Sequence, residues 1–398
     1  MKPLLLSAYT ATTCLGRGLN ETRSALHAGR SGLKPCDFES VRLDTWIGEV
    51  PYVDAQVLPA DLARFDCRNN RLAVMGLETD GFADAVRDAA RRYGSDRVGV
   101  FLGTSTSGIF ETELAYRQRS PESGALPEEF DYQCTQNSFS VAEFTRAYFG
   151  LEGMAMAVST ACSSSAKVFA SAARQLALGT IDAAVVGGVD TLCLTTLHGF
   201  ASLQLTSGRP CKPYDASRNG ISIGEGAAFA LLERVSEAAS GPGGVLLMGV
   251  GESSDAYHMS APHPEGLGAR MAMQAALKSA HLLADDVGYI NLHGTSTPAN
   301  DAAEGQAVMA LFGDRVPCSS TKGATGHTLG AAGALEAVFC AIALTDAYLP
   351  GSPGTEQLDP ATPLQYLMQG QSMPIRYALS NSFGFGGSNC SLILGMSV

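Results

Sequence analysis

The chain has 398 residues, 45% of them hydrophobic and 17% charged, and a formal net charge of −12 at pH 7. This length exceeds what one simple core needs, so we expect two or three domains, or two closely joined halves. The negative charge argues against general binding to nucleic-acid phosphates. No apolar run reaches the ~18 residues of a membrane-spanning helix, so we expect no membrane span.

The N-terminal stretch, residues 1–16, predicts a buried first strand rather than a signal peptide, because Ser7, Thr10 and Thr12 interrupt its apolar run. The chain has ten cysteines but no C-x-x-C pair. Without a secretory signal, this spacing predicts free and mostly buried thiols, and a cytoplasmic location.

Further along the chain, apolar runs bounded by glycine alternate with amphipathic stretches, which is typical of an α/β protein. The stretch 237–245, rich in alanine, serine, glycine and proline, predicts the boundary between two α/β halves. The predicted buried strands cover residues 98–103, 154–160, 183–189, 245–251, 287–294, 316–321 and 391–395. The predicted helices cover residues 163–178, 267–282, 301–312 and 329–346.

Cys162 lies where a predicted strand runs into a predicted helix, among the small residues that a sharp turn needs. The hydroxyl residues that follow, Ser163 to Ser165, can cap the helix. The positive end of the helix dipole favours the thiolate, which is the reactive form of cysteine. We therefore predict that Cys162 is a nucleophile that accepts an acyl group, and that the other nine cysteines are structural.

Two histidines, His293 and His327, each follow a predicted strand, precede a helix and lie next to a glycine. The ends of strands in α/β proteins are where active sites gather. We expect the other five histidines to be surface or core residues. A zinc site made of Cys162, His293 and His327 is the competing hypothesis, but no short-range pair of ligands anchors it, so metal catalysis is disfavoured.

Five motifs together resemble the β-ketoacyl-acyl carrier protein (ACP) synthases I and II, the elongating condensing enzymes of the thiolase-fold family. In the family's order they are TACSSS at 160–165, KPYDASRNGISIGEGA at 212–227, HGTSTPANDAAE at 293–304, KGATGHTLGAAGALE at 322–336 and NSFGFGGSN at 381–389. The resemblance implies an α/β fold with a thiolase-like five-layer αβαβα architecture. Its two similar halves would be residues 1–240, with the nucleophilic cysteine, and residues 241–398, with the two catalytic histidines.

The same resemblance implies a reaction. The Cys-His-His set resembles the catalytic set of the elongating enzymes. The sets of the initiating synthases and of the thiolases are instead similar to Cys-His-Asn and to Cys-His-Cys. An acyl group would move from acyl-ACP to Cys162, malonyl-ACP would lose CO₂, and the resulting enolate would attack the acyl-cysteine to give 3-oxoacyl-ACP. Such an acyltransferase requires no cofactor, because phosphopantetheine arrives on the carrier protein.

The family pattern also assigns roles near the thiol. The backbone N–H groups of Cys162 and Phe385 would form an oxyanion hole, and His293 and His327 would donate hydrogen bonds to the enolate oxygen. Lys322, paired with Glu336, would keep a positive charge near the site. Phe383 and Phe385 would be gate residues over the acyl pocket. Thr295 and Thr297 would bind the pantetheine amides, or would only cap the following helix.

Two further sites are implied by the family pattern. A monovalent cation would lie near Asn291, Glu336, Ser380 and Asn389. Arg68 and Arg71 resemble the basic residues that receive the acidic carrier protein, and their spacing of three places both on one helix face.

The partners implied are acyl carrier protein with its acyl and malonyl loads, and a second subunit, either a copy of this chain or a related one. The first 150 residues match the family less well, so fatty acid elongation and a polyketide or aryl-polyene pathway both stay open. Two alternatives remain: a thiolase- or acyltransferase-like enzyme that uses CoA substrates, and a non-catalytic ketosynthase partner subunit.

Overall fold

The computed structural model describes residues 1–235 and 243–397. The predicted boundary between residues 240 and 241, with most of the stretch 237–245, lies outside the described residues. The division into residues 1–240 and 241–398 therefore stays a prediction.

The described strands form a long mixed sheet with two parts. The first part has the order β6-β5-β7-β9-β1 and the second the order β12-β11-β15-β16-β10. The two parts meet only where β1 pairs with the start of β10, from Leu4 opposite Leu247 to Leu6 opposite Val245. The bounds of the strands in the first part are β1 Leu4–Thr13, β5 Val98–Gly103, β6 Ala155–Val158, β7 Ala183–Asp190 and β9 Gly226–Arg234. Those of the second are β10 Val245–Ser254, β11 Tyr289–Asn291, β12 Cys318–Ser319, β15 Tyr377–Gly384 and β16 Ser388–Met396.

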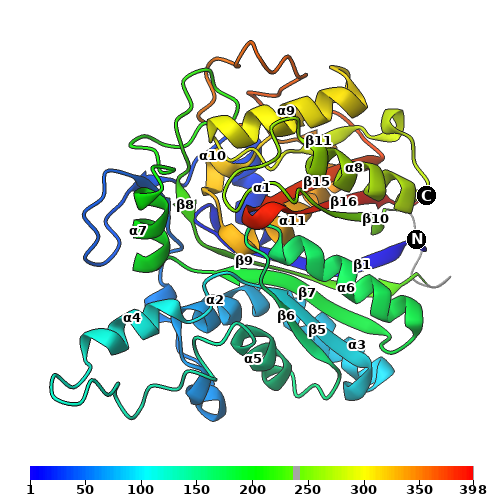
Figure 1. Ribbon diagram of the computed structural model, residues 1–398. Coiled ribbons are helices and arrows are strands. Elements are labelled where there is room, and N and C mark those ends of the chain that lie inside the picture. Colours follow the sequence, from blue (N-terminus) through cyan, green and yellow to red (C-terminus); the bar gives the residue numbers. More distant parts are fainter. Residues whose placement is uncertain (236–242, 398) are drawn as a thin grey trace.

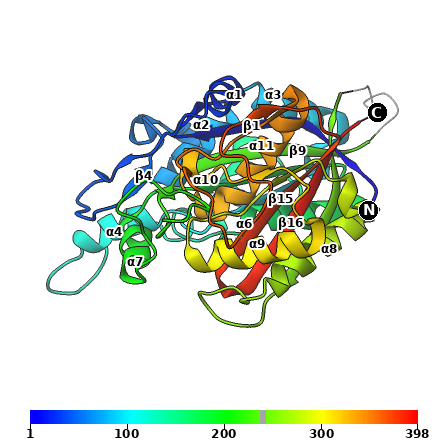
Figure 2. The same ribbon diagram turned by 90° about the horizontal axis from the view of Figure 1, so that it is seen from above.

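Helices cover both faces of each part and make five layers (Figures 1 and 2). In the middle layer α6 contacts β5 and β7 on one side and β10 and β16 on the other, and α11 likewise contacts both parts. The helices of the three layers are α2 Arg68–Leu77, α3 Phe82–Tyr93 and α5 Ser140–Tyr148 outside the first part, α6 Ser164–Leu178 and α11 Ala332–Asp346 between the parts, and α8 Leu267–Ala280 and α9 Pro298–Phe312 outside the second. The predicted αβαβα architecture is confirmed.

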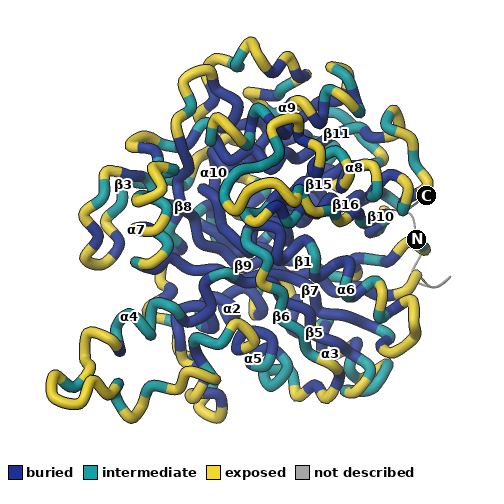
Figure 3. The backbone as a smooth tube through the Cα atoms, viewed as in Figure 1, coloured by how far each residue is buried: buried dark blue, intermediate teal, exposed yellow. Residues whose placement is uncertain are grey.

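Shorter elements complete the described chain. Exposed backbone gathers in the loop beyond α4, whereas the central strands are buried (Figure 3). These elements are β2 Gly16–Arg17, α1 Leu19–His27, β3 Lys34–Pro35, β4 Trp46–Gly48, α4 Ile109–Arg117, α7 Leu194–Ser202, β8 Ile223–Gly224, α10 Lys322–Thr325, β13 Tyr348–Leu349 and β14 Gln371–Ser372.

The middle layer explains the most apolar segment of the chain. Residues Leu329–Asp346 are long and apolar enough to cross a membrane, yet 89% of this stretch is buried inside the protein. A helix that is apolar on all sides is buried on all sides, and α11 meets this condition by lying between the two parts of the sheet. Within the described residues no other helix is long and apolar enough to span a membrane.

The predicted strands and helices all form, with ends that move by at most three residues. Two long strands were missed, and each has a physical reason. β9 is rich in alanine, which has little preference for strands. β15 has the buried polar residues Ser380, Asn381 and Ser382 in its middle, which interrupt its apolar pattern, and Asn381 donates to Glu304 at 3.1 Å.

Candidate active site

The predicted nucleophile and the two predicted catalytic histidines come together at the N-terminal end of α6. The Sγ atom of Cys162 and ring nitrogens of His293 and His327 all lie within 4.8 Å of one another, and each residue is at least 95% buried. The Sγ atom is 3.0 Å from Nε2 of His327. The rings of the two histidines meet edge to face, with centroids 5.3 Å apart.

The turn before α6 presents the thiol by means of its own serines. Ala161 has a φ of 52°, a left-handed backbone that costs free energy for a residue other than glycine. Ser164 Oγ accepts the N–H of Thr160 at 2.9 Å, and Ser163 Oγ donates to the carbonyl of Thr160 at 2.9 Å. The prediction that the serines cap the helix is wrong, since Ser163 makes no side-chain capping bond, because these hydroxyls fold back to brace the turn.

The thiol of Cys162 is not poised as a free thiolate. Burial raises its pKa to about 11, and this exceeds the lowering by the ammonium of Lys322 and by the backbone N–H groups of Phe385 and of Cys162 itself. The predicted bias toward thiolate is therefore wrong for the resting protein, because the second part of the sheet covers the end of α6. The N–H groups of Phe385 and Cys162 both lower the pKa of this thiol, and their role as an oxyanion hole stays a prediction.

His327 is held in one tautomer by its own turn. The N–H of Leu329 donates to Nδ1 of His327 at 3.2 Å, so the proton of the neutral ring lies on Nε2, the atom that faces Cys162. The peptide of His327 is bound on both sides by the stretch 222–224, through its N–H to Ser222 and its carbonyl to the N–H of Gly224. Burial, followed by the charge of Lys322, holds the pKa of His327 well below its usual value of 6.5.

His293 has the same protonation for a different reason. Nζ of Lys322 lies 3.4 Å from its Nδ1 and donates to its carbonyl at 2.5 Å. An ammonium can only donate, so Nδ1 is an acceptor and the proton lies on Nε2. Burial, then Lys322 and then His327, hold the pKa of this imidazole well below 6.5. Both rings therefore remain neutral and offer an Nε2–H donor.

This protonation argues against the zinc hypothesis. A histidine that binds zinc through Nε2 needs its proton on Nδ1, where His327 meets the N–H of Leu329 and His293 meets Lys322. The buried ammonium would also add a positive charge beside the metal. The cluster is suited to an anion rather than to a cation.

Lys322 forms a buried ion pair with Glu336, as predicted. Burial raises the pKa of Glu336 to about 7, against the lowering by Lys322. Behind this pair, both amide atoms of Asn291 and Oε2 of Glu336 are buried without a hydrogen bond to any described residue. Ser380 lies directly opposite Asn291 across the paired strands β11 and β15. Unpartnered oxygen atoms of this kind fit a small cation.

Asn389 does not belong with these groups. Its amide donates to Asp255 at 2.8 Å. It pairs with Phe383, three positions along β15 from Ser380, which is about 10 Å at the usual rise of a strand. The predicted inclusion of Asn389 is therefore wrong.

A cavity of about 230 Å³ leads to the cluster. Its lining includes the predicted gate and pantetheine residues Phe383, Phe385, Thr295 and Thr297. The ring of Phe383 lies 5.8 Å from that of His293. Thr297 occupies the N-cap position of α9 without a side-chain capping bond, and its hydroxyl instead lies 2.9 Å from that of Thr295. The capping alternative therefore loses its support.

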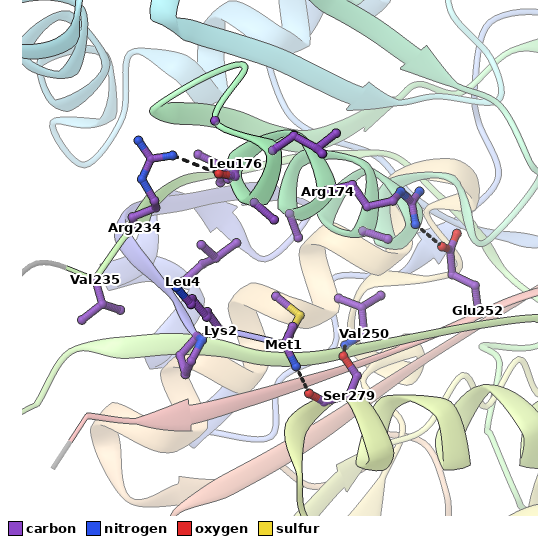
Figure 4. A pocket seen from close by; sticks show the side chains of 16 residues that line it. Met1, Lys2, Leu4, Arg174, Leu176, Arg234, Val235, Val250, Glu252 and Ser279 are labelled. Carbon is purple, nitrogen blue, oxygen red and sulfur yellow. Dashed lines mark hydrogen bonds and ion pairs between the residues drawn. The ribbon is translucent and has the colours of Figure 1, made fainter.

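A second cavity, of about 880 Å³, lies at the opposite end of α6 (Figure 4). Its lining includes the N-terminal residues Met1 to Leu4 and the side chains of Arg174 and Arg234, but none of the Cys-His-His cluster. Although it is larger, its position excludes it as the place of chemistry at Cys162.

The prediction that Arg68 docks the carrier protein is wrong. Its side chain is 1% exposed and forms ion pairs with the buried carboxylate of Glu225 and with Asp54. Arg71 remains partly exposed, but Asp66 binds its guanidinium through two hydrogen bonds of 2.6 and 2.7 Å. A spacing of three residues places two side chains near one another but does not say which of them faces inward.

Two buried carboxylates that position the site were missed. Glu304 accepts the backbone N–H groups of His293 and Gly294, both at 2.8 Å, and so fixes the turn that carries His293. Asp190, at the end of β7, accepts hydrogen bonds from residues 104–106 and from Gly330. Glu304 lies within a motif that could have indicated it, and Asp190 directly follows the predicted strand 183–189, at the kind of strand end where active sites gather.

The chain matches two family models, described as the N-terminal domain of β-ketoacyl synthase over residues 4–238 and its C-terminal domain over residues 245–356. A relative from Coxiella burnetii, named 3-oxoacyl-[acyl-carrier-protein] synthase 2, is 32% identical with 98% of each chain covered. One of the same name from Rhizobium meliloti is 42% identical, with 61% of each chain covered.

Solved structures agree with these sequence relatives. The ketosynthase ApeO of Xenorhabdus doucetiae, in complex with its chain length factor ApeC, superposes with a TM-score of 0.90 at 38% identity and covers 99% of this chain and 98% of that one. A β-ketoacyl synthase from Burkholderia phymatum superposes with a TM-score of 0.88 at 31% identity over the full length of both chains. The chain belongs to the β-ketoacyl synthase family and is an acyltransferase of the 3-oxoacyl-ACP synthase type.

Proposed function

We propose that Cys162, His293 and His327 carry out the decarboxylative condensation of an acyl group with malonyl-ACP. The observation that supports this most strongly is the placement of two neutral imidazoles, each with its proton on Nε2, around a buried thiol whose sulfur is 3.0 Å from one of them. This set offers hydrogen-bond donors where a negative oxygen would form.

In the first half-reaction the sulfur of Cys162 attacks the acyl thioester on the phosphopantetheine of the carrier. The N–H groups of Cys162 and Phe385 stabilise the oxyanion. The carbon–sulfur bond to pantetheine breaks, the acyl group remains on Cys162, and the proton of the thiol ends on the departing pantetheine sulfur. Burial raises the pKa of this thiol to about 11, against the lowering by Lys322 and by these N–H groups.

In the second half-reaction malonyl-ACP occupies the same cavity and loses CO₂. The electron pair of the broken carbon–carbon bond forms an enolate, and the Nε2–H groups of His293 and His327 stabilise its oxygen. Because burial and Lys322 keep both rings neutral, these donors do not lose their protons to the enolate. The enolate carbon then attacks the carbonyl carbon of acyl-Cys162, and the carbon–sulfur bond to Cys162 breaks. A 3-oxoacyl-ACP that is two carbons longer is released, and the Cys162 thiolate takes up a proton from solvent to restore the thiol.

The walls of the cavity suit the arm of the carrier. Thr295 and Thr297 present neighbouring hydroxyls that can bind the pantetheine amides. Phe383 and the half-buried Phe385 line the cavity together with Cys162 and act as the gate to the acyl chain. Phosphopantetheine on the carrier is the only prosthetic group this scheme uses.

A monovalent cation, held by Asn291, Glu336 and Ser380, would complete the support behind Lys322. The two unpartnered amide atoms of Asn291 and the free oxygen of Glu336 support this placement. When bound, the cation supplies positive charge that balances the carboxylate of Glu336.

The chain acts as the catalytic subunit of a dimer with a second chain of the same fold. Its similarity to a ketosynthase solved with its chain length factor makes a related partner, and a polyketide-type or aryl-polyene pathway, the first possibility to test beside fatty acid elongation in a homodimer. All ten cysteines are free, which supports a reducing cytoplasm. The native mass of the purified chain, compared with the 41.4 kDa of one copy, distinguishes self-association from a need for another subunit.

The test is incubation of the purified protein with a panel of acyl-ACPs and malonyl-ACP, followed by mass spectrometry of the protein and the products. An acyl group on Cys162 and a product extended by two carbons are expected. Condensation of CoA thioesters without loss of CO₂ would instead identify a thiolase. A folded dimer that forms neither the acyl-enzyme nor a product would indicate a non-catalytic subunit.

A further inference from the structure

Asp190 is a fully buried carboxylate that stands outside the reacting groups, at the end of β7. Its Oδ1 atom accepts four hydrogen bonds, from the hydroxyls of Thr104 and Thr106 at 2.7 Å and from the N–H groups of Ser105 and Thr106 at 2.8 Å. No described lysine or arginine forms an ion pair with it. Its charge is stabilised by neutral donors, an arrangement that needs a built site rather than a chance contact.

The other oxygen of Asp190 reaches the second half of the active site. Oδ2 accepts the N–H of Gly330 at 2.5 Å. The contact is so close that a Cβ atom at Gly330 would lie 2.8 Å from this oxygen and 2.6 Å from Oγ of Ser105. The carboxylate thus holds residues 104–106 and Gly330 against one another.

Each of these two segments leads directly to a reacting group. The hydroxyl of Ser105 donates to the carbonyl of Ala161, the residue before the nucleophile, at 3.4 Å. Next to Gly330, the N–H of Leu329 donates to Nδ1 of His327 and so sets its tautomer. Ala161 and Leu329 have φ values of 52° and 51°, so both turns adopt a left-handed backbone that the surroundings must hold in place.

We propose that Asp190 is a positioning residue that joins the nucleophile turn to the His327 turn and keeps the Nε2–H of His327 directed at Cys162. This inference rests on the proposed condensation. Activation of the thiol is not its task, since the negative charge of Asp190 raises the pKa of Cys162. A carboxylate is required because both of its oxygens accept, whereas an amide presents an NH₂ group on one side.

The change Asp190→Asn separates the two sides of this contact. The amide oxygen will turn toward the four donors of residues 104–106 and place its NH₂ group against the N–H of Gly330. The turn at Leu329 then shifts and His327 loses the donor that fixes its tautomer. Acylation of Cys162 should stay within about threefold of the wild type, whereas decarboxylation of malonyl-ACP should fall about tenfold to a hundredfold in kcat with little change in KM, because displacement of a catalytic group by about 1 Å can cost that factor.

A spectroscopic measurement tests the same inference without activity. Nitrogen-15 NMR of labelled histidines, with the His327 signal assigned by His327→Asn, should show the Nε2–H tautomer in the wild type and a mixture in Asp190→Asn. The matched control is Asp215→Asn, a buried carboxylate that accepts the N–H groups of Glu356 and Gln357 in another loop. It should leave the tautomer and both half-reactions unchanged.

If Asp190→Asn does not fold, Gly330→Ala pushes the same N–H away from the carboxylate and should show the same mixture of His327 tautomers. Because its Cβ atom also crowds Oγ of Ser105, the tautomer and not the ratio of the two half-reactions is then the readout. An unchanged tautomer with decarboxylation within about twofold of the wild type, or an equal loss of both half-reactions, would overturn the inference. A wild-type protein that does not decarboxylate malonyl-ACP would refute the proposed function, while the tautomer measurement would still decide the role of Asp190.

Discussion

The two ends of helix α6 meet cavities of opposite character. At the C-terminal end the larger cavity contains charged groups that already have partners: Arg174 pairs with Glu252 at 2.7 Å, and Arg234 donates to the carbonyl of Leu176 at 2.9 Å (Figure 4). At the N-terminal end a much smaller cavity reaches Cys162 and the two histidines. The position of groups that can react, rather than the size of the space, distinguishes the active site.

The difference also appears in the backbone. The N-terminal end is built from turns with left-handed residues, Ala161 and Leu329, that buried polar groups brace. The C-terminal end closes with Gly179, whose φ of 73° is ordinary for glycine at the end of a helix. Strain is therefore concentrated where the reacting atoms must be held, and substitutions at the two ends should have unequal effects.

The largest effect is expected from Cys162→Ala. Without the sulfur no acyl-enzyme can form, so condensation should fall below detection while the fold is kept, because alanine fits a position that is already buried. Intact-protein mass spectrometry after incubation with acyl-ACP checks this. An acyl group still bound to the variant would show that another residue is the nucleophile.

Removal of either histidine should reduce decarboxylation strongly. His293→Ala and His327→Ala each delete one donor to the enolate oxygen, and loss of such a donor typically lowers kcat about 10²- to 10³-fold. His293→Ala should affect acylation of Cys162 less, because His327 is the ring next to the sulfur. Release of CO₂ from malonyl-ACP and formation of acyl-enzyme, measured separately, decide this. Equal losses of decarboxylation and of acylation in His293→Ala would contradict the assigned roles.

Arg68→Met should affect stability rather than carrier binding. It leaves the buried Glu225 without its partner, which typically costs about 3–5 kcal/mol of unfolding free energy. Denaturant unfolding measures the loss, with Arg71→Met, at a partly exposed ion pair, as the control of small effect. The ratio of KM for acyl-ACP to KM for an acyl-pantetheine mimic should not change. A selective rise in KM for acyl-ACP would restore Arg68 as a docking residue.

The reactivity of Cys162 should depend steeply on pH. Below its pKa of about 11 the group is a neutral thiol, and the thiolate fraction rises as the pH increases. Alkylation by iodoacetamide should therefore accelerate about tenfold per pH unit between pH 7 and 9, where an ordinary cysteine with a pKa of about 8.5 would begin to level off. Peptide mass spectrometry follows the modification of Cys162. A rate that is constant above pH 7 would show a stabilised thiolate.

The smallest effect is expected at the other end of the helix. Ala177→Leu fills part of the larger cavity with a larger side chain and does not touch the polar groups around Cys162. The rates of both half-reactions should stay within about twofold of the wild type, as for most surface changes. A large loss of condensation with an intact fold would mean that the C-terminal cavity takes part in the reaction.

The sequence was sufficient for the elements with strong apolar patterns and for the reacting residues. Helix α6 has an apolar stripe at helical spacing, and α11 and the central strands are continuous apolar runs, so these patterns hardly depend on their neighbours. Cys162, His293 and His327 stand in glycine-rich turns with a recognisable family spacing. Their geometric convergence agrees with that prediction, whereas their individual roles stay a proposal.

Properties that depend on which layers meet could not be predicted. The pKa of Cys162 depends on its burial by the second part of the sheet, and the inward direction of Arg68 depends on the buried Glu225, 157 residues away in the chain. Asp190 shows the same limit, because its donors come from two separate segments, residues 104–106 and Gly330. A single carboxylate in a sequence does not reveal such a set.

The most direct test of the central claim is CO₂ release from malonyl-ACP, without an acyl primer, by Cys162→Ala and by Cys162→Ala combined with His293→Ala. The account predicts that the first variant still decarboxylates malonyl-ACP, since the two imidazoles are intact, and that the second loses this activity about 10²- to 10³-fold. Equal CO₂ release by both variants, or none by a folded Cys162→Ala protein, would contradict the claim that the histidine pair stabilises the enolate.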